Sequence, residues 1–324
     1  MRPIDIRRDL PALSELIEVS FADELSRRGG DFSAELDSAR RMVPLIRLLG
    51  RFSNSFQHIL DGFVWEDEGR IVASVVVQKM GNDPTRWLIG TVATHPKYRR
   101  QGLARKLTMQ AIEHARSCGA RTCVLDVRAE NAPAYNLYRG LGFTHYDSTT
   151  ELKLETWPSV KPMPVEGYTL REMRLDEWRG RYDLALRATP PDVQAFMPIN
   201  EAEYRVPGLM SLAMPLLVRL QRLHACRWVV ERDAVFVATA RLLARLTPNT
   251  THEIDLVFDP AHRAALAEPL LTLLLSTLDG YAKQNVLAQV RTSDTDLMAL
   301  LKQYGFVEIE TNHRLGAKLE QNND

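Results

Sequence analysis

The sequence predicts a mixed α/β protein made of two tandem copies of one fold. Three observations support this prediction. The chain has 324 residues, more than a single hydrophobic core usually organises. Prolines punctuate the stretch 155–167 (ETWPSVKPMPVEG), where they block helix and sheet hydrogen bonding and favour an extended connector. Similar motifs recur on both sides of this connector at a nearly constant spacing.

The spacing of these motifs indicates a duplication. Arg263 lies 164 positions after Arg99, and each follows a proline by three residues. Phe306 lies 163 positions after Phe143, and each is preceded by glycine. Such a constant spacing is the signature of a repeat. We therefore divide the chain into a first domain, a proline-rich linker and a second domain, at 1–156, 157–167 and 168–324.

The first half opens with short elements that alternate in type. Residues 4–6 read as a strand, and Asp9 is expected to cap the helix that follows, with Pro11 in its first turn. Residues 21–60 look mainly helical. Runs rich in β-branched and aromatic residues flank polar turns and predict a hairpin in each half, at 63–65 with 71–78 and at 228–230 with 234–238.

The next stretch predicts a helix between two strands. An apolar strand over 87–94 ends at a proline, and a basic turn leads into a helix over 102–118. Apolar residues at helical spacing, beginning at Leu103, give this helix a face that packs on the sheet, and Gly119 ends it. Further on we expect a strand, a short helix and a closing hairpin, at 122–127, 133–139, and 143–146 with 151–154.

The composition is that of a globular protein. Apolar residues make up 45% and charged residues 25% of the chain, which rules against disorder. Lys plus Arg (41) balance Asp plus Glu (41), so we expect no nucleic acid and no membrane surface as partner. The oily run 270–278 is too short to span a bilayer. The chain opens with charged residues, so we expect no secretory signal and a cytoplasmic location.

The cysteines and histidines give no sign of a metal site. Three cysteines provide neither a disulfide framework nor paired ligand spacing. Cys118 ends a helix and Cys123 begins a strand, so both read as structural thiols rather than acyl carriers. An ordinary charged strand end and helix start explains the remaining cluster, which consists of His252, Asp255, Asp259 and His262.

The turn from Tyr98 to Arg105 carries the clearest chemical signal. It follows a strand and opens a helix, so unpaired N–H groups of the first helical turn converge there. Gly102 lets a ligand approach the backbone, while Arg99 and Arg100 add charge suited to phosphates. A glycine-punctuated helix start with solvated arginines explains the isolated turn equally well. The turn lacks both the glycine pattern of a dinucleotide fingerprint and the Gly-Lys-Ser/Thr ending of a P-loop.

Two spaced motifs in the first half resemble those of a known enzyme family. Arg99, Gly102 and Ala104 fit Arg or Gln, two residues, Gly, one residue, Gly or Ala, at the end of a strand. Asn131 and Tyr138 stand seven residues apart before a Gly-Phe strand start. These motifs resemble the GNAT superfamily of acyl-CoA-dependent N-acyltransferases. The resemblance is strong from the first hairpin to that strand start. It implies two tandem GNAT folds, each a mixed, mostly antiparallel sheet flanked by helices.

The resemblance also implies acetyl-CoA as the cofactor and roles for individual residues. The splayed end of the strand would pair through its backbone with the pantetheine arm, and one N–H there would stabilise the oxyanion that amine attack creates. Tyr138 resembles the residue that gives a proton or hydrogen bond to the departing thiolate. Asn131 is interpreted both as a cofactor contact and as a helix N-cap. The implied cofactor residues are Val92, Ala93, Thr94, Arg99, Arg100, Gln101, Gly102, Leu103, Ala104, Arg105 and Asn131.

A general base is missing from the family pattern. An incoming ammonium must lose a proton before its nitrogen can attack. Many relatives use a Glu six residues before the strand-end proline, where this chain has Gly90. Asp126, Asp61 and a water chain are the alternatives. His95 lies beside the phosphate turn and is interpreted mainly as structural.

The second half keeps the core pattern and loses the chemical positions. The resemblance thus becomes one to tandem GNAT proteins in which a single half is active, as in the mycothiol synthase-like group. We expect the second half to buttress the first. The counterparts of Arg99, Gly102, Ala104, Asn131 and Tyr138 are Arg263, Leu266, Glu268, Asp294 and Leu301.

The function implied by this resemblance is transfer of an acetyl group from acetyl-CoA to a primary amine. The amine would belong to a small molecule or a peptide and would attack directly within a ternary complex. Two alternatives stay open: a non-catalytic acyl-CoA-binding or regulatory module, and an acyltransferase with a different donor or acceptor. The chain is expected to act as a monomer or a homodimer.

Overall fold

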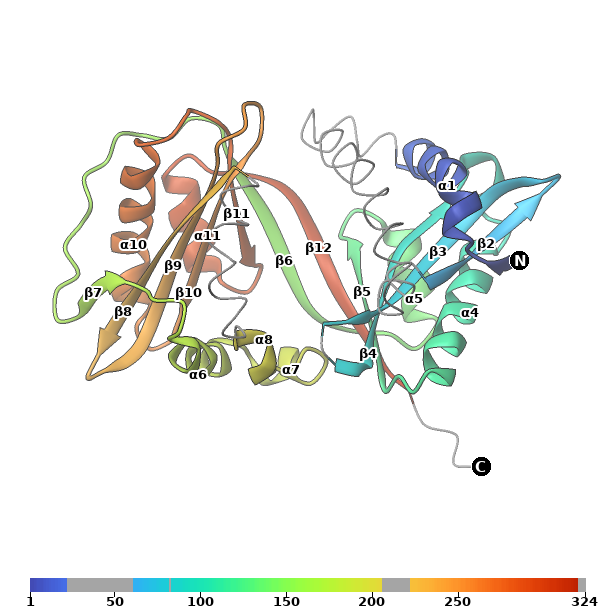
Figure 1. The fold of residues 1–324 in the computed structure, drawn as a ribbon, viewed down its shortest axis with the longest axis horizontal. Coiled ribbons are helices and arrows are strands. Elements are labelled where there is room, and N and C mark those ends of the chain that lie inside the picture. The colour runs from blue at the N-terminus through green and yellow to red at the C-terminus, as the bar shows by residue number, and fades with distance from the viewer. Residues whose placement is uncertain (22–60, 82, 206–221, 320–324) are drawn as a thin grey trace. The chain divides into compact units, whose positions relative to one another are not determined.

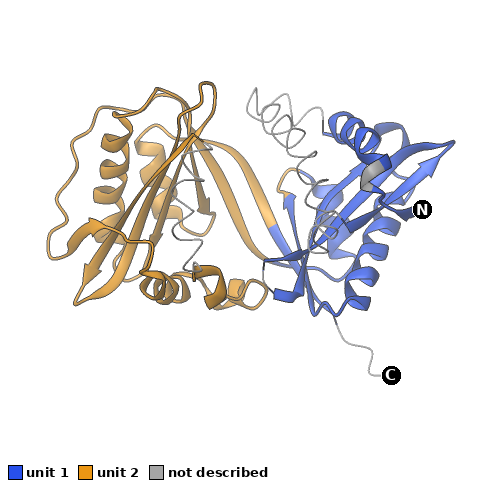
Figure 2. Cartoon of the chain, in the orientation of Figure 1, with its two compact units in different colours: residues 1–127, 131–145, 314–324 blue, residues 128–130, 146–313 orange. Residues whose placement is uncertain are grey.

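The computed structural model describes residues 1–21, 61–81, 83–205 and 222–319. The chain divides into two compact units (Figure 2). Unit 1 comprises 1–127, 131–145 and 314–324, and unit 2 comprises 128–130 and 146–313. The helical region expected over 21–60 lies outside the described residues from 22 onward.

The first half of the chain builds a sheet with helices on its faces (Figure 1). In unit 1 the strand order is β1-β2-β3-β4-β5, followed by the end of β12 (Val307–Lys318) from Arg314 onward. The first four strands pair antiparallel, and β4 pairs parallel with β5. The predicted first hairpin is present as β2 and β3. The elements are β1 (Arg2–Pro3), α1 (Ile6–Ser20), β2 (Asp61–Asp67), β3 (Arg70–Met80), β4 (Asp83–Thr94), the 3-10 helix η2 (Pro96–Tyr98), α4 (Leu103–Ser117), β5 (Thr122–Arg128) and α5 (Ala132–Arg139).

The second half repeats this order of elements. In unit 2 the sheet runs β6-β11-β10-β9-β8-β7, again antiparallel except for one central parallel pair, β10 with β11. The mixed, mostly antiparallel sheet of the prediction is therefore confirmed in both halves. The elements are β6 (Thr144–Leu154), β7 (Thr169–Glu172), α6 (Trp178–Ala188), α7 (Pro191–Gln194), α8 (Glu201–Tyr204), β8 (Leu223–Arg232), β9 (Val235–Arg245), β10 (His252–Phe258), α10 (Arg263–Leu278), β11 (Val286–Arg291), α11 (Thr295–Gln303) and β12 (Val307–Lys318).

Helix α4 covers one face of the unit 1 sheet, as its apolar spacing predicted. Leu107, Ala111 and Ala115 are completely buried in the core against β2, β3 and β4. Burying each large apolar side chain stabilises the fold by about 1.5–3 kcal/mol. Gly119 ends the helix in the left-handed region (φ +86°), and the next residue, Ala120, donates its N–H to Ala115 O at 2.9 Å.

The last strand of each repeat completes the other unit. Leu315 and Ala317 of β12 are buried in the core of unit 1. Leu152 and Leu154 of β6 are buried in the core of unit 2. The sequence-based division placed each strand with its own half of the chain. Neither half of the sequence thus contains a whole sheet.

The closing hairpin predicted over 143–146 and 151–154 is wrong. Residues Thr144–Leu154 form one continuous strand, β6. The polar residues in its middle suggested a turn, but Thr149 and Thr150 pair in register with Arg291 and Val290 of β11. Sheet pairing with a distant segment has overridden the local turn signal.

The first elements begin earlier than predicted. The strand is β1, and α1 starts at Ile6, so Asp9 lies inside the first turns rather than at the cap. Its buried carboxylate still accepts a backbone N–H, from Asp5 at 2.8 Å. Asp9 also receives two hydrogen bonds from the Arg2 guanidinium, at 2.6 and 2.8 Å, and Arg2 binds Glu66 of β2 at 2.6 Å. This ion cluster fastens β1, α1 and β2 together.

The proline-rich connector is packed within unit 2. Residues 157–166 contain no helix or strand. Trp157 is buried and donates Nε1–H to Asp279 at 3.0 Å, and Met163 N–H donates to the Thr272 hydroxyl of α10 at 3.1 Å. Within the described ranges, every helix is too short or too polar to cross a lipid bilayer.

Candidate functional site

Strands β4 and β5 separate within the sheet of unit 1. Their parallel pairing ends at Leu88 opposite Val124. Strand β4 continues to Thr94 and β5 to Arg128, and along these described segments the two strands do not pair. The β4 backbone groups that face β5 beyond Leu88 therefore lack a strand partner. The predicted backbone site from Val92 onward lies in this separated segment.

A β-bulge bends β4 at the start of the separated segment. Val76 of β3 pairs with Gly90 and Ser74 pairs with Ala93, so one strand carries an extra residue between the two pairs. Thr91 lies in the bulge with φ +38°, which is rare for a β-branched residue and costs about 1–3 kcal/mol. Bulges beside active sites re-aim backbone groups. Thr91 was not among the predicted site residues, although Gly90, a glycine inside a strand, is the sequence signal for a bulge.

The turn between β4 and α4 presents free backbone donors. Arg100 (φ +62°) and Gly102 (φ +76°) both have left-handed backbone conformations. No described residue accepts a hydrogen bond from the backbone N–H groups of 101–105. The space beside Gly102 is open, since a Cβ added there would meet nothing within 4 Å. With the positive end of the α4 dipole, the turn suits an anion such as a diphosphate.

The arginines of the turn differ in what they contact. Arg99 Nη2 donates to Ser20 O at 3.0 Å and Nε donates to Thr94 O at 3.4 Å, so its side chain holds the turn against α1 and β4. Arg100 and Arg105 are exposed and have no polar partner among the described residues, which leaves both guanidinium groups available to phosphates. The Thr94 hydroxyl is buried without a hydrogen-bond partner, as expected of a group that awaits a ligand.

The other residues predicted in the turn contribute mainly backbone. The Leu103 side chain is buried in the core of unit 1, so only its N–H faces the turn. Gln101 is exposed and Ala104 is half-buried. Asn131 caps α5, because its Oδ1 accepts the Ala134 N–H at 3.1 Å. The predicted N-cap role of Asn131 is thus confirmed.

Tyr138 lies on α5 with its ring in the core of unit 1. The side chain is 7% exposed, and its ring meets Phe143 edge-on with the centroids 6.1 Å apart. No described residue hydrogen-bonds its hydroxyl. Burial raises the pKa of Tyr138 to about 12, because the apolar surroundings disfavour the phenolate. The hydroxyl therefore keeps its proton at neutral pH and can donate it.

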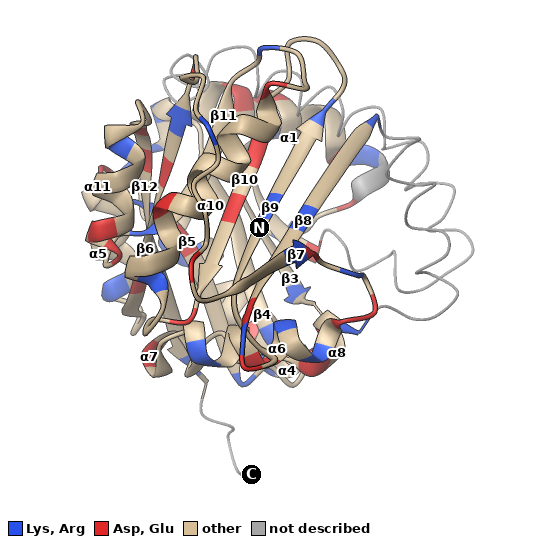
Figure 3. Cartoon of the chain, turned by 90° about the vertical axis from the view of Figure 1, so that its left-hand side faces the viewer, with Lys and Arg blue, Asp and Glu red and all other residues tan. Residues whose placement is uncertain are grey.

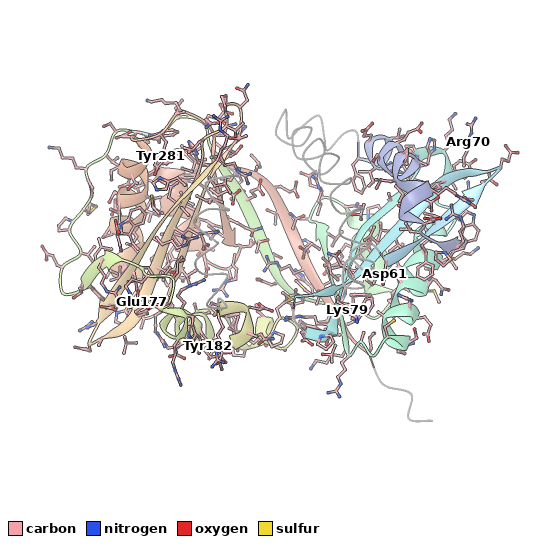
Figure 4. The ribbon with its side chains drawn as sticks, viewed as in Figure 1. Asp61, Arg70, Lys79, Glu177, Tyr182 and Tyr281 are labelled. Carbon is pink, nitrogen blue, oxygen red and sulfur yellow. The ribbon has the colours of Figure 1, made fainter. Side chains whose placement is uncertain are left out.

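The two carboxylates considered as general bases have different surroundings. Asp61 at the start of β2 (Figure 4) has Oδ2 3.7 Å from His114 Nε2. His114 lies 12 residues beyond Gly102 on α4, about 18 Å along the helix axis at 1.5 Å per residue, so Asp61 is remote from the turn. Asp126 is exposed on β5, beyond the last pair with β4, with Oδ1 4.0 Å from Arg314 Nε.

His95 and the first-half thiols have structural contacts. His95 is the N-cap of η2, and its Nδ1 accepts the Lys97 N–H at 3.3 Å. Cys123 is buried in the core, and burial raises the pKa of its thiol to about 12, which suppresses the nucleophilic thiolate. Cys118 lies exposed at the end of α4. Among the residues that the structure describes, no group of three or more His, Cys, Asp or Glu is placed to hold a metal ion.

Unit 2 has the same separation of strands without the bulge. Strands β10 and β11 pair over three positions, from His252 opposite Val286 to Ile254 opposite Ala288, and β10 then runs on to Phe258. The first-half pairing of β4 with β5 also spans three positions. The pairing of β10 with β9, however, is regular along its whole length. Strand β10 thus carries no bulge.

The turn before α10 is replaced by helix. Helix α4 begins at Leu103, seven residues after Pro96, whereas α10 begins at Arg263, three residues after Pro260. The helix therefore starts four residues, about one turn, earlier in the second repeat. The residues that correspond to the turn before α4 form the first turn of α10.

The side chains at these positions are also committed elsewhere. Arg263 forms ion pairs with Asp294 (Nη1 to Oδ1, 2.6 Å) and Asp296 (Nε to Oδ2, 3.0 Å). Leu266 and Leu301, the counterparts of Gly102 and Tyr138, are buried in the core of unit 2. At these positions unit 2 thus has neither an arginine without an ion pair nor the tyrosine hydroxyl of unit 1.

A family model matches part of the first half of the chain. Residues 34–143 match the model of the Acetyltransferase (GNAT) family. The chain is 35% identical over 91 residues to the [ribosomal protein bS18]-alanine N-acetyltransferase of Escherichia coli K12, covering 28% of this chain and 59% of that protein. It is 30% identical over 146 residues to the mycothiol acetyltransferase of Thermobispora bispora, covering 45% of this chain and 46% of that one. The chain therefore spans less than two thirds of the length of these relatives.

Two solved structures share the fold over the whole chain. A tandem GNAT protein from the clavulanic acid biosynthesis pathway has a TM-score of 0.59 at 17% identity, covering 98% of this chain and 97% of that one. A GCN5-related N-acetyltransferase from Sphaerobacter thermophilus has a TM-score of 0.60 at 16% identity, covering 98% and 95%. The predicted tandem GNAT fold is confirmed, and residues 34–143 of this chain match the model of the Acetyltransferase (GNAT) family.

Proposed function

We propose that unit 1 transfers an acetyl group from acetyl-CoA to a primary amine, and that unit 2 does not bind CoA. One observation carries the proposal. In unit 1 the separated strand carries a bulge with the strained Thr91, the turn before α4 is left-handed at Arg100 and Gly102, and α5 carries the Tyr138 hydroxyl. Of these features, unit 2 keeps the strand separation. A purely structural repeat has no need of the strained Thr91.

The residues of unit 1 fit the parts of a CoA thioester. The free N–H groups of 101–105 and the unpaired side chains of Arg100 and Arg105 would hold the diphosphate. The β4 backbone from Val92 to Thr94 would pair with the pantetheine arm as an added strand does. When bound, acetyl-CoA supplies an acetyl group activated as a thioester.

Two groups of the chain would assist the transfer. A backbone N–H of the bulged β4 segment would donate to the thioester oxygen, where negative charge develops as the amine attacks. The Tyr138 hydroxyl, protonated at neutral pH because its pKa is about 12, would donate to the departing sulfur. Asp126, which lies on β5 beyond the last pair with β4, is the carboxylate that we assign to accept the amine proton, directly or through water.

The names of the relatives suggest which amines to test as acceptors. Their names include a ribosomal protein alanine and L-methionine sulfoximine, so the acceptors tested should include peptides with a free amino terminus and small amines. The experiment measures CoA release from acetyl-CoA for each amine with the full chain. Acetylation of at least one amine class is the expected result.

Tyr138→Phe and Tyr135→Phe form a matched pair on α5. Tyr138→Phe should lower kcat by about a hundredfold or more while CoA binding stays unchanged. Tyr135, which is half-buried and lies 3.5 Å from His145 Nδ1 through its hydroxyl, should tolerate the change. Equal turnover of both variants would remove Tyr138 from the mechanism. CoA binding with no acetylation of any amine would favour the non-catalytic CoA-binding module that Gly90 suggests.

A further inference from the structure

Unit 2 contains a cavity of about 850 Å³ that the proposed acetyl transfer does not use. Its floor is formed by β8, β9 and β10, on the face of the sheet opposite α10, and helices α6 and α8 form its wall. The volume is that of a site for a small organic molecule. Apolar side chains contribute much of the lining, among them Met173, Leu184, Leu223 and Val257.

Three arginines line this cavity. Arg227 of β8 lies directly opposite Arg241 of β9, which in turn lies opposite Asp255 of β10. The basic segments of β8 and β9 can be followed side by side in Figure 3. Arg181 enters from α6, where its guanidinium stacks 5.5 Å from the centroid of the Tyr204 ring. Like charges on directly opposed strand positions repel each other, so this row is unfavourable in the free protein.

The three arginines differ in their partners. Arg241 has Nε 3.8 Å from Asp255 Oδ2, and Arg181 has its aromatic contact with Tyr204. Arg227 has neither an ion pair nor a side-chain hydrogen bond among the described residues. Burial, together with the neighbouring Arg241 and Arg181, lowers the pKa of Arg227. A guanidinium that is half-buried and unpaired is the group that an oxyanion would stabilise.

Neither carboxylate that lines the cavity pairs with Arg227 among the described contacts. Asp255 lies next to Arg241 rather than Arg227, and Glu203 of α8 is already engaged with another residue. With three arginines against two carboxylates, the lining keeps an excess of positive charge. Neither Arg181 nor Arg227 has a carboxylate partner among the described residues, and of the two Arg181 has the aromatic contact with Tyr204.

The wall of the cavity is fixed by its own contacts. Glu177, at the start of α6 (Figure 4), receives two hydrogen bonds from Arg171 of β7, at 3.0 and 2.7 Å. Arg171 also binds Glu231 of β8, so one arginine ties α6 to the sheet. The rings of Tyr182 and Tyr204 meet at 5.9 Å and join α8 to α6. The arginines are therefore presented by a preformed scaffold.

We propose that the unit 2 cavity binds a small organic anion, a carboxylate or phosphate group on an apolar body, with Arg227 as its principal contact. The planar guanidinium fork of Arg227 would take two oxygens of the anion, with Arg241 and Arg181 alongside. The apolar side chains would receive the body of the ligand. Unit 2, which has lost the acetyl-transfer features, thus has a ligand site of its own.

The test measures melting temperature and affinity of the full chain with benzoate, phenyl phosphate, benzamide and inorganic phosphate. Benzoate or phenyl phosphate should raise the melting temperature, and the one that does so identifies the oxyanion. Neutral benzamide should have no effect, and inorganic phosphate should bind more weakly than phenyl phosphate. If neither organic anion binds, or benzamide binds equally, the proposal is overturned.

Arg227→Met and Arg232→Met separate this site from the anion-binding turn of unit 1. Arg227→Met should weaken binding of the effective anion about tenfold or more, because a charge-assisted contact is lost. Arg232, exposed at the end of β8 and absent from the cavity lining, should be neutral. Without ligand, Arg227→Met should melt no lower than Arg232→Met, since an unpaired charge is removed. A lower melting point, or anion binding equal to that of Arg232→Met, would contradict the proposal.

Discussion

The two units share a separated pair of parallel strands and differ in the strand and turn that follow the separation. In both, a central parallel pair of strands holds together for three positions and then separates. Only unit 1 adds the bulge at Thr91 and the left-handed turn at Gly102. In unit 2 the strand is regular, and the helix begins one turn earlier. Strand separation therefore belongs to the repeated fold, whereas the bulge and the left-handed turn before the helix are local additions to unit 1.

The units also depend on each other for their last strand. Leu315 of β12 is completely buried in unit 1, and Leu152 of β6 is completely buried in unit 2. The second half of the sequence thus supplies part of the core of unit 1, which is a physical reason for the two halves to occur in one chain. This reason adds to the expectation that the second half buttresses the first.

The largest effect should come from this exchange of strands. Leu315→Ala should destabilise unit 1 and Leu152→Ala should destabilise unit 2, each by about 2–5 kcal/mol, because each leaves a cavity in a closed core. Hydrogen exchange followed by mass spectrometry assigns the effect to a unit. Leu315→Ala should speed exchange in α4, and Leu152→Ala should speed it in α10. If either variant instead speeds hydrogen exchange in the opposite unit, the assignment of these strands to the two cores would be contradicted.

A smaller effect should arise from the ion cluster that anchors unit 1. Hydrogen bonds from Arg2, assisted by the Asp5 N–H, lower the pKa of Asp9 to about 2. Because the folded pKa lies below the usual one, Asp9 stabilises the fold above about pH 4 and loses this contribution as pH falls through about 2. Asp9→Asn should cost about 2 kcal/mol at pH 7. Urea unfolding should show a smaller difference in unfolding free energy between the wild type and Asp9→Asn at pH 3 than at pH 7. An equal difference at both pH values would contradict the role of the ionised Asp9 carboxylate.

The smallest expected effect is a difference in CoA affinity between variants at Arg100, before α4, and at Arg263, the first residue of α10. Arg100→Ala should weaken CoA binding several-fold, because an exposed charge contributes about 1 kcal/mol to a phosphate contact. Arg263→Ala should leave CoA binding unchanged, since Arg263 is paired with Asp294 and Asp296 in unit 2. Isothermal titration with CoA measures both. A weaker CoA affinity of Arg263→Ala would place CoA in the second unit as well.

Much of this architecture could be predicted from local patterns. Apolar spacing located α4, β-branched runs located β2 and β3, and the spacing of Phe143 and Phe306 revealed the repeat. The exchange of strands could not be predicted, because which strand pairs with β5 is decided by long-range contacts. The continuous strand β6 was missed for the same reason, since its polar middle is stabilised by β11 and not by local preference.

The candidate site was predictable where it depends on residue type. Gly102 could be placed in a turn because glycine favours a left-handed backbone, and Tyr138 was singled out because its hydroxyl has a defined chemistry. The bulge at Thr91 was missed, although Gly90 signalled it, since a bulge is defined by the partner strand. The earlier start of α10 was missed because the matching prolines, Pro96 and Pro260, suggested equal turns.

The central claim, that CoA binds only to unit 1 through the turn at Gly102, is tested most directly by calorimetric titration of CoA into four proteins. The wild type should bind one CoA per chain. Gly102→Asp should lose binding, because a carboxylate would face the diphosphate, whereas Gly102→Asn, which tolerates a left-handed backbone and has no charge, should retain it. Ala265→Asp is the control in the first turn of α10, chosen because Ala265 is exposed while Leu266 is buried. It should bind like the wild type. Two CoA molecules per chain, or undiminished binding by Gly102→Asp, would contradict the account.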